Sequence, residues 1–589
     1  MPLQRRRPAS PPIGRLALGL TLFLTWTATQ ADLAPQAGFS DIEPIDFSLQ
    51  REGPTLRYRS SQARIFYSFQ PAEVPGGDPA SMPLFVFFNG GPGCPTCEGL
   101  LSSNTAPRAM FPYPWGPTGW TENTAANPHS WARLGNLLYV DPATTGYSYN
   151  LDPGVQRGSQ TSALYDAQNF NPYIDAAQMV RVVLRFLRAH PALGHNPVVL
   201  VGESYGGTRV TTMQNLMLNY RRYGAGTDVY RDTALMREIQ AYLDAYYNKA
   251  PGTIHSPAAI ARQFGRQILI EPQLTGAYQS QITGDLFEAP GSIIHQLAAA
   301  SGKTFVPCGD GCQPMEHAIR FVSSALYRSP YDTRLTVVNE GLLMFWFGLR
   351  TVLVPTMSEL MAYDLTQVPG LYADSRDHAY HLKIPADPLQ STLGLANIPP
   401  GQRAWFEVLP QVIAAGEAAA ADLGDPGLSG PTFAEAFGGL HEPDQHYVSC
   451  PPMGAYNAFY SNSAITQGYL IDPESPRYGR LFLENLPLVR TLITDARHDL
   501  MIYPDALPPS LARYTDLVKT STVQRPCPDC DATIAVEYQP SAAARLRLAF
   551  PRTQAIWFPR YQDAGHSVAA GMPKKLVDDV EAWMAGSKP

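Results

Sequence analysis

The sequence predicts an α/β fold, with a central, mostly parallel β-sheet flanked by helices. Strand-like apolar runs occur at 84–88, 136–140 and 198–201, and again at 488–493 and 555–558. The run at 84–88 is continuously apolar, which is typical of a strand that is buried on both faces. Residues 173–190 place apolar side chains on one face at helical spacing, and this predicted helix precedes the third run. The order strand, helix, strand is typical of parallel pairing, so both ends of the chain are expected to contribute to one sheet.

A Gly-x-Ser-x-Gly pattern follows the third run directly, from Gly202 to Gly206. When this pattern joins a strand to a helix, the tight turn lifts the serine out of the sheet edge. The helix N-terminus then directs unpaired N–H groups toward whatever the serine attacks. Alone, the pattern also fits an ordinary glycine-rich turn. The other strand ends are what favour Ser204 as a nucleophile.

Three further strand ends carry groups suited to catalysis. The run 84–88 ends in Asn-Gly-Gly-Pro-Gly-Cys at 89–94. Its glycines can adopt conformations closed to other residues, and beside a nucleophile their N–H groups can form an oxyanion hole, although a plain turn is the alternative. Thr-Asp-Ala-Arg-His-Asp at 494–499 and Ala-Gly-His at 564–566 follow the two late strands. Because catalytic groups of such sheets lie at the carboxyl ends of strands, the order Ser, Asp, His predicts one site.

The pattern changes between about 215 and 467, where helix-like stretches such as 234–247 and 315–326 dominate. We interpret 215–467 as a mainly helical cap inserted between core segments 32–214 and 468–589, with one possible core strand near 267–270. His378 and His381, with Asp374 and Asp377 nearby, would suit a metal ion. Solvated polar residues of a loop explain them more simply, so no metal or other cofactor is expected.

Residues 1–31 predict a signal peptide. A basic region, from Arg5 to Arg15, precedes an apolar stretch at 16–26 and small residues at 29–31. The apolar stretch is too short to span a bilayer comfortably, although an N-terminal anchor is the alternative. We therefore expect export to the periplasm or the extracellular space and no stable membrane span in the mature protein. The net charge of −7, without a basic run beyond the N-terminus, argues against nucleic acid as a partner.

Seven cysteines fit an oxidising compartment. The Cys-x-x-Cys pairs at 94–97 and 527–530 have zinc-ribbon spacing, but they lie far apart in the sequence. Short disulfides that close loops are the simpler interpretation, and we expect Cys308–Cys312 and Cys527–Cys530 to be two of them.

Together these motifs resemble the serine carboxypeptidase family, which has an α/β-hydrolase fold. The matching blocks are 89–94, 136–149, 202–206, His498-Asp499 and 564–566, and they occur in the family's order. The resemblance covers roughly residues 55–210 and 480–585, and the central region matches poorly. It implies that Ser204 is the nucleophile, that His566 is the general base, and that Asp499 holds the histidine tautomer, with Asp495 as the rival acid.

The resemblance also implies an oxyanion hole and a binding site for the substrate's C-terminal carboxylate. The N–H groups of Gly91 and Tyr205 would form the oxyanion hole. Asn89 and Glu203 would bind the carboxylate, which Glu203 can do only when it is protonated and donates a hydrogen bond. The sequence departs from the family at two places: Phe87 replaces a tryptophan, and the segment 102–104 lacks an acid, although Glu98 is near.

The implied function is that of a secreted serine carboxypeptidase, which releases C-terminal residues from peptide substrates through an acyl-enzyme. An esterase or acyltransferase with the same triad is the alternative. A non-catalytic binding protein on this fold is a further reading, against which the intact Ser/Asp/His set argues. The family commonly bridges the first-motif cysteine to one before the catalytic aspartate, which implies Cys94–Cys450; Cys94–Cys97 is the alternative. Side-chain preference and oligomeric state stay open.

Overall fold

The chain separates into residues 1–32 and residues 33–589, and the second unit carries the fold. The computed structural model describes residues 33–50, 55–110, 124–143, 145–150, 171–225, 230–247, 249–274, 360–369, 371–374, 379–382, 481–496, 518–523, 533–538, 556–561 and 566–586, together with 295, 298–299, 303–306, 499, 502 and 564.

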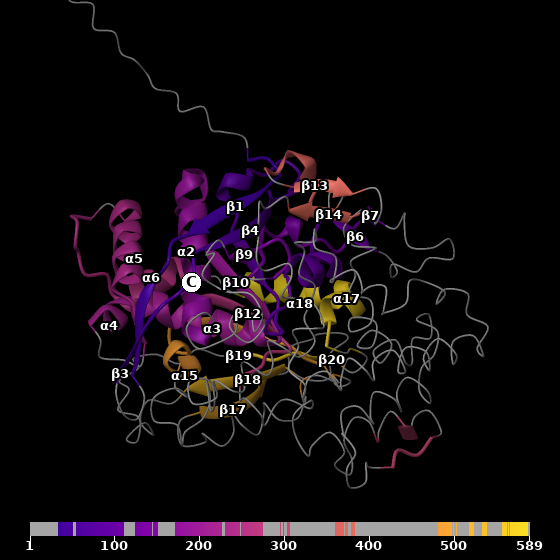
Figure 1. The fold of residues 1–589 in the computed structure, drawn as a ribbon. Coiled ribbons are helices and arrows are strands. Elements are labelled where there is room, and N and C mark those ends of the chain that lie inside the picture. The colour runs from indigo at the N-terminus through magenta and orange to yellow at the C-terminus, as the bar shows by residue number, and fades with distance from the viewer. Residues whose placement is uncertain are drawn as a thin grey trace, which may run out of the picture. The chain divides into compact units, whose positions relative to one another are not determined.

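The described residues form a nine-stranded sheet with the strand order β1-β4-β8-β5-β10-β12-β15-β19, and β9 pairs with β4 (Figure 1). These strands are β1 (Gln36–Ile42), β4 (Ala63–Gln70), β5 (Leu84–Phe88), β8 (Asn136–Val140), β9 (Tyr149–Asn150), β10 (Val198–Glu203), β12 (Arg266–Ile270), β15 (Arg490–Ile493) and β19 (Ile556–Trp557). Pairing is parallel from β8 to β19 and antiparallel at β1, β4 and β9. The predicted α/β-hydrolase fold, with its mostly parallel sheet, is confirmed.

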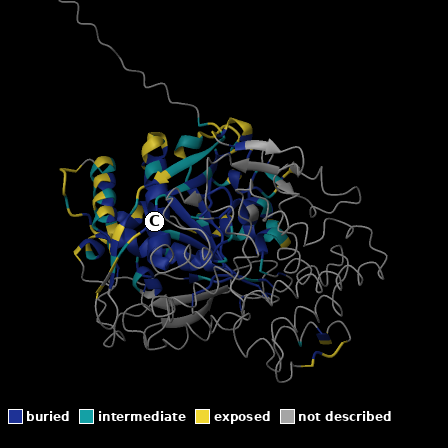
Figure 2. Cartoon of the chain, viewed as in Figure 1, coloured by how far each residue is buried: buried dark blue, intermediate teal, exposed yellow. Residues whose placement is uncertain are grey.

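Both faces of this sheet are covered. Alternate residues of β5 point to opposite faces, so Leu84, Val86 and Phe88 lie in one hydrophobic cluster and Phe85 and Phe87 in another. The first cluster is closed by α2 (Pro172–Ala189), α3 (Tyr205–Leu218), α4 (Tyr220–Ala225), α5 (Thr233–Tyr246), α6 (Pro257–Phe264) and α15 (Leu481–Asn485). The second is closed by helical segment η2 (Cys97–Thr105), α17 (Val568–Gly571) and α18 (Pro573–Ala585). Figure 2 shows the buried strands between these layers.

Smaller sheets and turns complete the described part of the chain. The sheets are β11-β2-β3, β6-β7, β13-β14, β16-β20 and β17-β18. Their strands are β2 (Asp46–Gln50), β3 (Thr55–Arg59), β6 (Arg108–Met110), β7 (Thr124–Ala126), β11 (Tyr230–Arg231), β13 (Leu371–Asp374), β14 (Ala379–Leu382), β16 (Asp495–Ala496), β17 (Val518–Val523), β18 (Thr533–Tyr538) and β20 (Arg560–Tyr561). Short helical turns are η1 (Pro79–Ser81), η3 (Trp131–Arg133), η4 (Pro191–Leu193) and η7 (Leu365–Gln367).

The strand predicted at 488–493 begins two residues later than expected. The N–H groups of Leu488 and Val489 both donate to the Asn485 carbonyl at the end of α15, at 2.9 and 2.8 Å. These two residues therefore complete a turn, and the ladder of β15 starts at Arg490.

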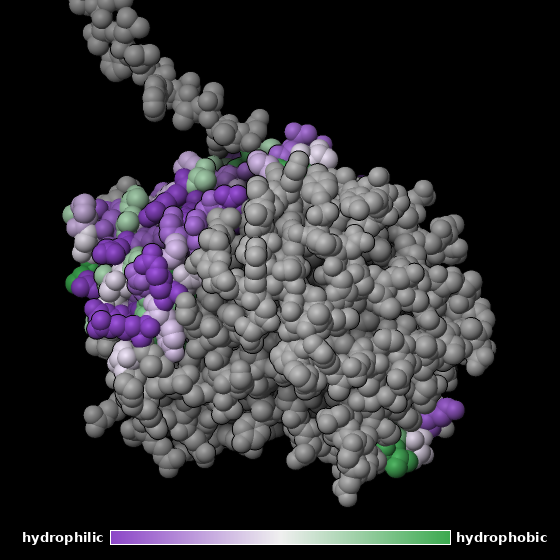
Figure 3. Space-filling view, in the orientation of Figure 1, coloured by the Kyte–Doolittle hydropathy of each residue, from purple (hydrophilic) through white to green (hydrophobic). Residues whose placement is uncertain are grey.

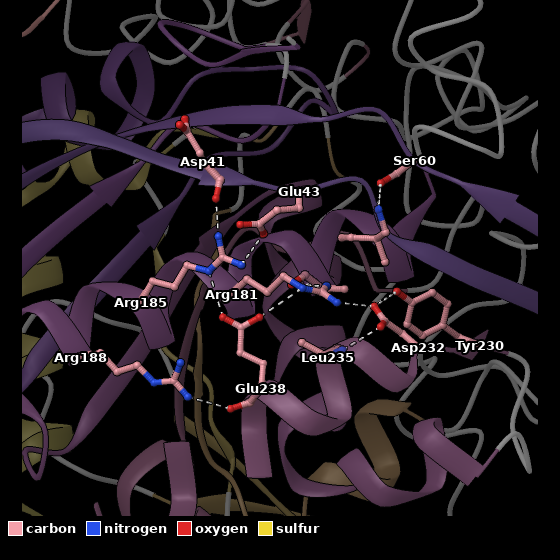
Figure 4. Close-up of polar contacts among 12 residues, drawn as sticks. Asp41, Glu43, Ser60, Arg181, Arg185, Arg188, Tyr230, Asp232, Leu235 and Glu238 are labelled. Carbon is pink, nitrogen blue, oxygen red and sulfur yellow. Dashed lines mark hydrogen bonds and ion pairs between the residues drawn. The ribbon is translucent and has the colours of Figure 1, made fainter. Parts of the chain in front are cut away.

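A network of buried and half-buried ion pairs joins α2 to α5 (Figure 4). Arg181 donates from Nη2 to Asp232 Oδ2 at 2.7 Å, and their side chains are 3% and 0% exposed. Asp232 also caps α5 by accepting from the Leu235 N–H at 2.8 Å. Arg185, one turn along α2, pairs with Glu238 at 2.9 Å and reaches Glu43 at 2.8 Å. The described surface in Figure 3, around β1, α4 and α5, is mainly hydrophilic.

The start of the predicted cap region packs with the core. Helices α5 and α6 belong to the first hydrophobic cluster, and β12 lies in the sheet between β10 and β15. Most of 275–467, including the helix predicted at 315–326, lies outside the described residues, so the cap stays a prediction. The predicted signal peptide and the pair Asp377 and His378 also lie outside them. No helix within the described segments is long and apolar enough to cross a membrane.

Candidate active site

The predicted nucleophile lies in a sharp turn between β10 and α3. Ser204 has φ 57° and ψ −125°, a backbone conformation that residues other than glycine rarely adopt. It is typical of a nucleophile elbow. The Ser204 N–H donates to the Ile270 carbonyl of β12 at 2.9 Å. A Cβ on Gly202 would lie 2.2 Å from the Gly206 carbonyl oxygen, so the turn cannot form with a side chain at 202. The neighbouring strand thus stabilises a backbone that presents Ser204 at the sheet edge.

The glycine loop after β5 contacts this elbow directly. A Cβ on Gly90 would lie 2.5 Å from Ser204 Cβ and 2.8 Å from the Tyr205 backbone nitrogen. Gly91 has φ 101°, which favours glycine. The two segments that carry the predicted oxyanion donors, Gly91 and Tyr205, therefore lie against each other.

Asn89 is held from three sides at the start of this loop. Its N–H donates to Thr96 Oγ1 and its Oδ1 accepts from the Leu100 N–H, both at 3.0 Å. Its backbone carbonyl accepts from Arg209 Nη1 at 2.5 Å. With Oδ1 facing the backbone of η2, the Nδ2 of Asn89 is left as the donor toward Glu203.

The structure brings His566 and Asp499 together. His566 Nδ1 lies 2.7 Å from Asp499 Oδ2, and the Asp499 side chain is fully buried. Burial lowers the pKa of His566, but the charge and hydrogen bond of Asp499, together with the charge of Glu203, raise the pKa above its usual value. Asp495 pairs instead with Arg560, at 2.6 Å. The geometry therefore favours Asp499 over Asp495 as the partner of the histidine.

Glu203 directly precedes Ser204 at the elbow, near enough to His566 and Asp499 for their charges to act on it. Its side chain is buried, and burial is the main reason that its pKa is raised to about 7. The nearby His566 and the hydrogen bond from Asn89 lower the pKa, and the charge of Asp499 raises it. Glu203 Oε2 has no hydrogen-bond partner among the described residues. A carboxyl group in this setting can donate a hydrogen bond near neutral pH.

Glu271 is a buried acid that the sequence reasoning missed. It directly follows β12, and its carboxyl accepts from Thr494 Oγ1 and from the Ala496 N–H, both at 2.8 Å. Burial and the charges of Asp499 and Asp495 raise the pKa of Glu271 well above its usual range. An acid directly after the strand-like run at 267–270 was the signal that could have identified it. Glu271 connects the end of β12 to the segment that leads to Asp499.

Both departures from the family pattern occupy buried positions. Phe87 stacks on Tyr139 with ring centroids 4.6 Å apart and offers no N–H group. Ser103 and Asn104 are buried in place of an acid, and Asn104 Nδ2 donates to the Ala570 carbonyl at 3.4 Å. The side chain of Glu98 lies outside the described residues.

The cysteine alternatives are partly resolved. Cys97 is a buried thiol rather than half of a disulfide, so the Cys94–Cys97 alternative is wrong. Cys94 is disulfide-bonded to a residue outside the described part of the chain. The Cys94–Cys450 bridge, Cys308–Cys312 and Cys527–Cys530 therefore stay predictions.

Comparison with known proteins gives a match to a family model, partial matches to curated relatives and alignments with solved structures. Residues 53–230 match the family model Peptidase_S10, serine carboxypeptidase. Serine carboxypeptidase-like 44 of Arabidopsis thaliana is 33% identical over 157 residues, covering 26% of this chain and 28% of that protein. Lysosomal protective protein of Mus musculus is 29% identical over 205 residues, covering 34% and 37%. The chain thus spans about a third of the length of the curated relatives it matches.

A solved structure also aligns with the fold. It is the crystal structure of Kex1(delta)p, a prohormone-processing carboxypeptidase from Saccharomyces cerevisiae, which aligns with a TM-score of 0.42 and 13% identity. The alignment covers 94% of this chain and 91% of that one.

Proposed function

We propose that the protein is a serine-type carboxypeptidase that releases C-terminal residues from peptides through an acyl-enzyme on Ser204, because residues 53–230 match the serine carboxypeptidase family model. The observation that supports this proposal is the 2.7 Å contact between His566 and the buried Asp499, two residues whose charges act on the elbow glutamate Glu203. A serine hydroxyl needs a base within reach, and the resulting imidazolium needs a buried anion behind it.

The residues present divide the reaction between them. Ser204 Oγ attacks the carbonyl carbon of the last peptide bond while His566 Nε2 accepts its proton. The N–H groups of Gly91 and Tyr205 hold the oxyanion of the tetrahedral intermediate. The C–N bond then breaks as His566 returns the proton to the leaving amine, which departs as the C-terminal amino acid. Water, activated by His566, hydrolyses the acyl-enzyme in the same way, with Asp499 stabilising each imidazolium.

Recognition of the C-terminus would fall to Asn89 and Glu203. Protonated Glu203 donates to the substrate carboxylate, and Asn89 Nδ2 donates beside it. The buried, unpartnered Oε2 of Glu203 and its raised pKa support this role. A free peptide C-terminus would therefore distinguish a substrate from an internal peptide bond.

A second function keeps the triad but changes the substrate to an ester, or the acceptor from water to another hydroxyl. Two observations favour it: the buried Ser103 and Asn104 stand where the family has an acid, and Phe87 has no N–H group to offer. Both changes weaken recognition of a carboxylate without touching the serine chemistry.

Export of the chain after removal of residues 1–31 is part of the proposal, supported by the basic and apolar pattern of that segment. N-terminal sequencing of the protein recovered from the periplasm or medium tests it. Sequence beginning at residue 1 in that fraction would contradict it.

Three measurements test the activity. A fluorophosphonate probe should label the wild-type protein and leave Ser204→Ala unlabelled, and the variant should lose a factor of about 10⁴ or more in kcat. Digestion of a peptide, followed by mass spectrometry, should give a ladder of products shortened from the C-terminus. Labelling without a ladder, but with ester cleavage, would favour the second function. Equal labelling of Ser204→Ala would refute both.

A further inference from the structure

A buried arginine on α3 contacts both segments that carry the proposed oxyanion donors. The Arg209 side chain is fully buried, and its Nε donates to Asp175 Oδ2 of α2 at 2.8 Å. Its Nη1 donates to the Asn89 carbonyl, two residues before Gly91. The guanidinium also lies over the Tyr205 ring, 5.1 Å from its centroid, and the Tyr205 hydroxyl donates to the same Asp175 oxygen at 3.2 Å.

We propose that Arg209 is a positioning residue that holds the Asn89–Gly91 loop and the N-terminus of α3 in the relative geometry an oxyanion hole needs. The inference rests on the proposed serine chemistry. Arg209 touches neither the substrate nor the reacting atoms; it acts through the two backbone segments.

The argument depends on the freedom of the glycine loop. Gly90 and Gly91 adopt many backbone conformations, so the loop needs contacts from outside to hold one. A peptide unit is planar, so a hydrogen bond to the Asn89 carbonyl fixes the orientation of the whole Asn89–Gly90 unit. The Cys94 N–H, which donates to the Gly90 carbonyl at 3.2 Å, holds the next unit. The loop is therefore fixed at both peptide units that precede the Gly91 N–H.

A structural role alone does not explain this arrangement well. A buried ion pair is often no more stabilising than apolar side chains of similar volume. Arg181 and Asp232 form such a pair on the same helix layer, but Arg181 donates to the Ala177 carbonyl of its own helix, at 3.3 Å. Arg209 Nη1 instead donates to the Asn89 carbonyl, at the start of the loop that packs against Ser204. This difference makes Arg181 a matched control.

The test compares Arg209→Met with Arg181→Met in the full-length protein. Both variants leave a buried aspartate without its arginine partner, so both should lower the melting temperature. Only Arg209→Met should lower kcat for an ester substrate, by about 10- to 100-fold, and slow fluorophosphonate labelling by a similar factor. This is less than the loss of a whole oxyanion donor, about 10²- to 10³-fold, because the donors are displaced rather than removed. The KM for the ester should change by less than about two-fold. The oxyanion hole contacts the transition state rather than the bound ester in its ground state.

Two further variants separate positioning from folding. Arg209→Lys keeps the charge beside Asp175 but lacks the planar fork that serves two acceptors, so it should fold and still lose kcat. Arg209→Met/Asp175→Asn removes the unpaired carboxylate, and it should recover melting temperature without recovering kcat.

Wild-type kcat in Arg209→Lys, or recovery of kcat together with melting temperature in the double variant, would overturn the inference alone. If the wild-type protein itself is not labelled by the fluorophosphonate and cleaves no ester, the proposed function is wrong. The role of Arg209, which rests on that function, is then wrong as well. Equal loss of kcat in Arg181→Met and Arg209→Met would mean that the arginine acts only through folding.

Discussion

Replacing Glu203 with glutamine should separate the binding of a substrate carboxylate from the chemistry at Ser204. Burial raises the pKa of Glu203 to about 7, so its carboxyl is mostly protonated in weak acid and mostly charged in weak alkali. Only the protonated form donates to a carboxylate, and the apparent dissociation constant rises as the competent fraction falls. That fraction falls from about one half at pH 7 to about 1% at pH 9, so the KM of a free-acid peptide should rise about 50-fold.

Glutamine donates a hydrogen bond at every pH, so Glu203→Gln should flatten this rise.

The same substitution should also change the pH dependence of kcat at acidic pH. The Glu203 carboxylate is one of the groups that raise the pKa of His566, after the Asp499 charge and hydrogen bond. His566 must be neutral to act as a base, so activity is lost as the pH falls through its pKa. Removing the Glu203 charge lowers that pKa, and the acid limb of kcat should shift to lower pH.

The assay measures kcat and KM from about pH 5 to about pH 9 for one peptide with a free or an amidated C-terminus, and for an ester. The amidated peptide and the ester should show no alkaline rise in KM with the wild-type enzyme. Glu581→Gln, a change on the exposed face of α18, is the matched control and should behave as wild type. An alkaline rise in KM that is equal for free-acid and amidated peptides would refute carboxylate recognition by Glu203.

Four other substitutions test the site. Asp499→Asn should reduce kcat by about 10⁴-fold while Asp495→Asn stays within about ten-fold of wild type, and the reverse order would transfer the acid role to Asp495. Gly90→Ala should abolish fluorophosphonate labelling, because its Cβ would lie 2.5 Å from Ser204 Cβ; normal labelling would contradict the close packing of loop and elbow. The pKa of Glu271 is raised in the folded state, so the free energy of unfolding falls as the pH rises from the pKa of an ordinary glutamate toward the raised pKa. Glu271→Gln should reduce that fall, measured by urea titrations at several pH values. An unchanged dependence of the unfolding free energy on pH would refute the raised pKa.

The strands and the elbow were predictable because local sequence determines them. β5 and β10 are buried at every residue, which is why β5 is apolar throughout and β10 is apolar from Val198 to Val201. The elbow needs glycine where a side chain would collide with its own turn, as at Gly202, so its pattern is short and continuous. The pairing of His566 with Asp499 instead depends on segments 67 residues apart, and the resemblance to a family supplied it.

The buried charges were not predictable in the same way. Arg209 and Glu271 lie in segments that look like an ordinary helix and an ordinary loop. Their partners, the Asn89 carbonyl and Thr494, lie 120 and 223 residues away in the sequence. No spacing rule within one segment marks such residues, because the contact that gives each its role forms only when the sheet has assembled.

The buried acids around His566 differ in what balances their charge, and this determines how the site should respond to pH. Asp499 has the histidine and the Ile502 N–H, at 2.7 and 2.9 Å. Among the described residues, Thr494 Oγ1 and the Ala496 N–H, both neutral donors, bond the Glu271 carboxyl, and burial raises its pKa well above the usual range, which favours the protonated form. Glu203 is left as the acid that changes charge near pH 7, and its charge also raises the pKa of His566. The proposed peptide cleavage needs protonated Glu203 with neutral His566. Attraction between a Glu203 carboxylate and a His566 imidazolium favours the other arrangement, in which the same proton lies on the histidine. The pair therefore titrates as one coupled unit, and the productive form is greatest between its two apparent pKa values.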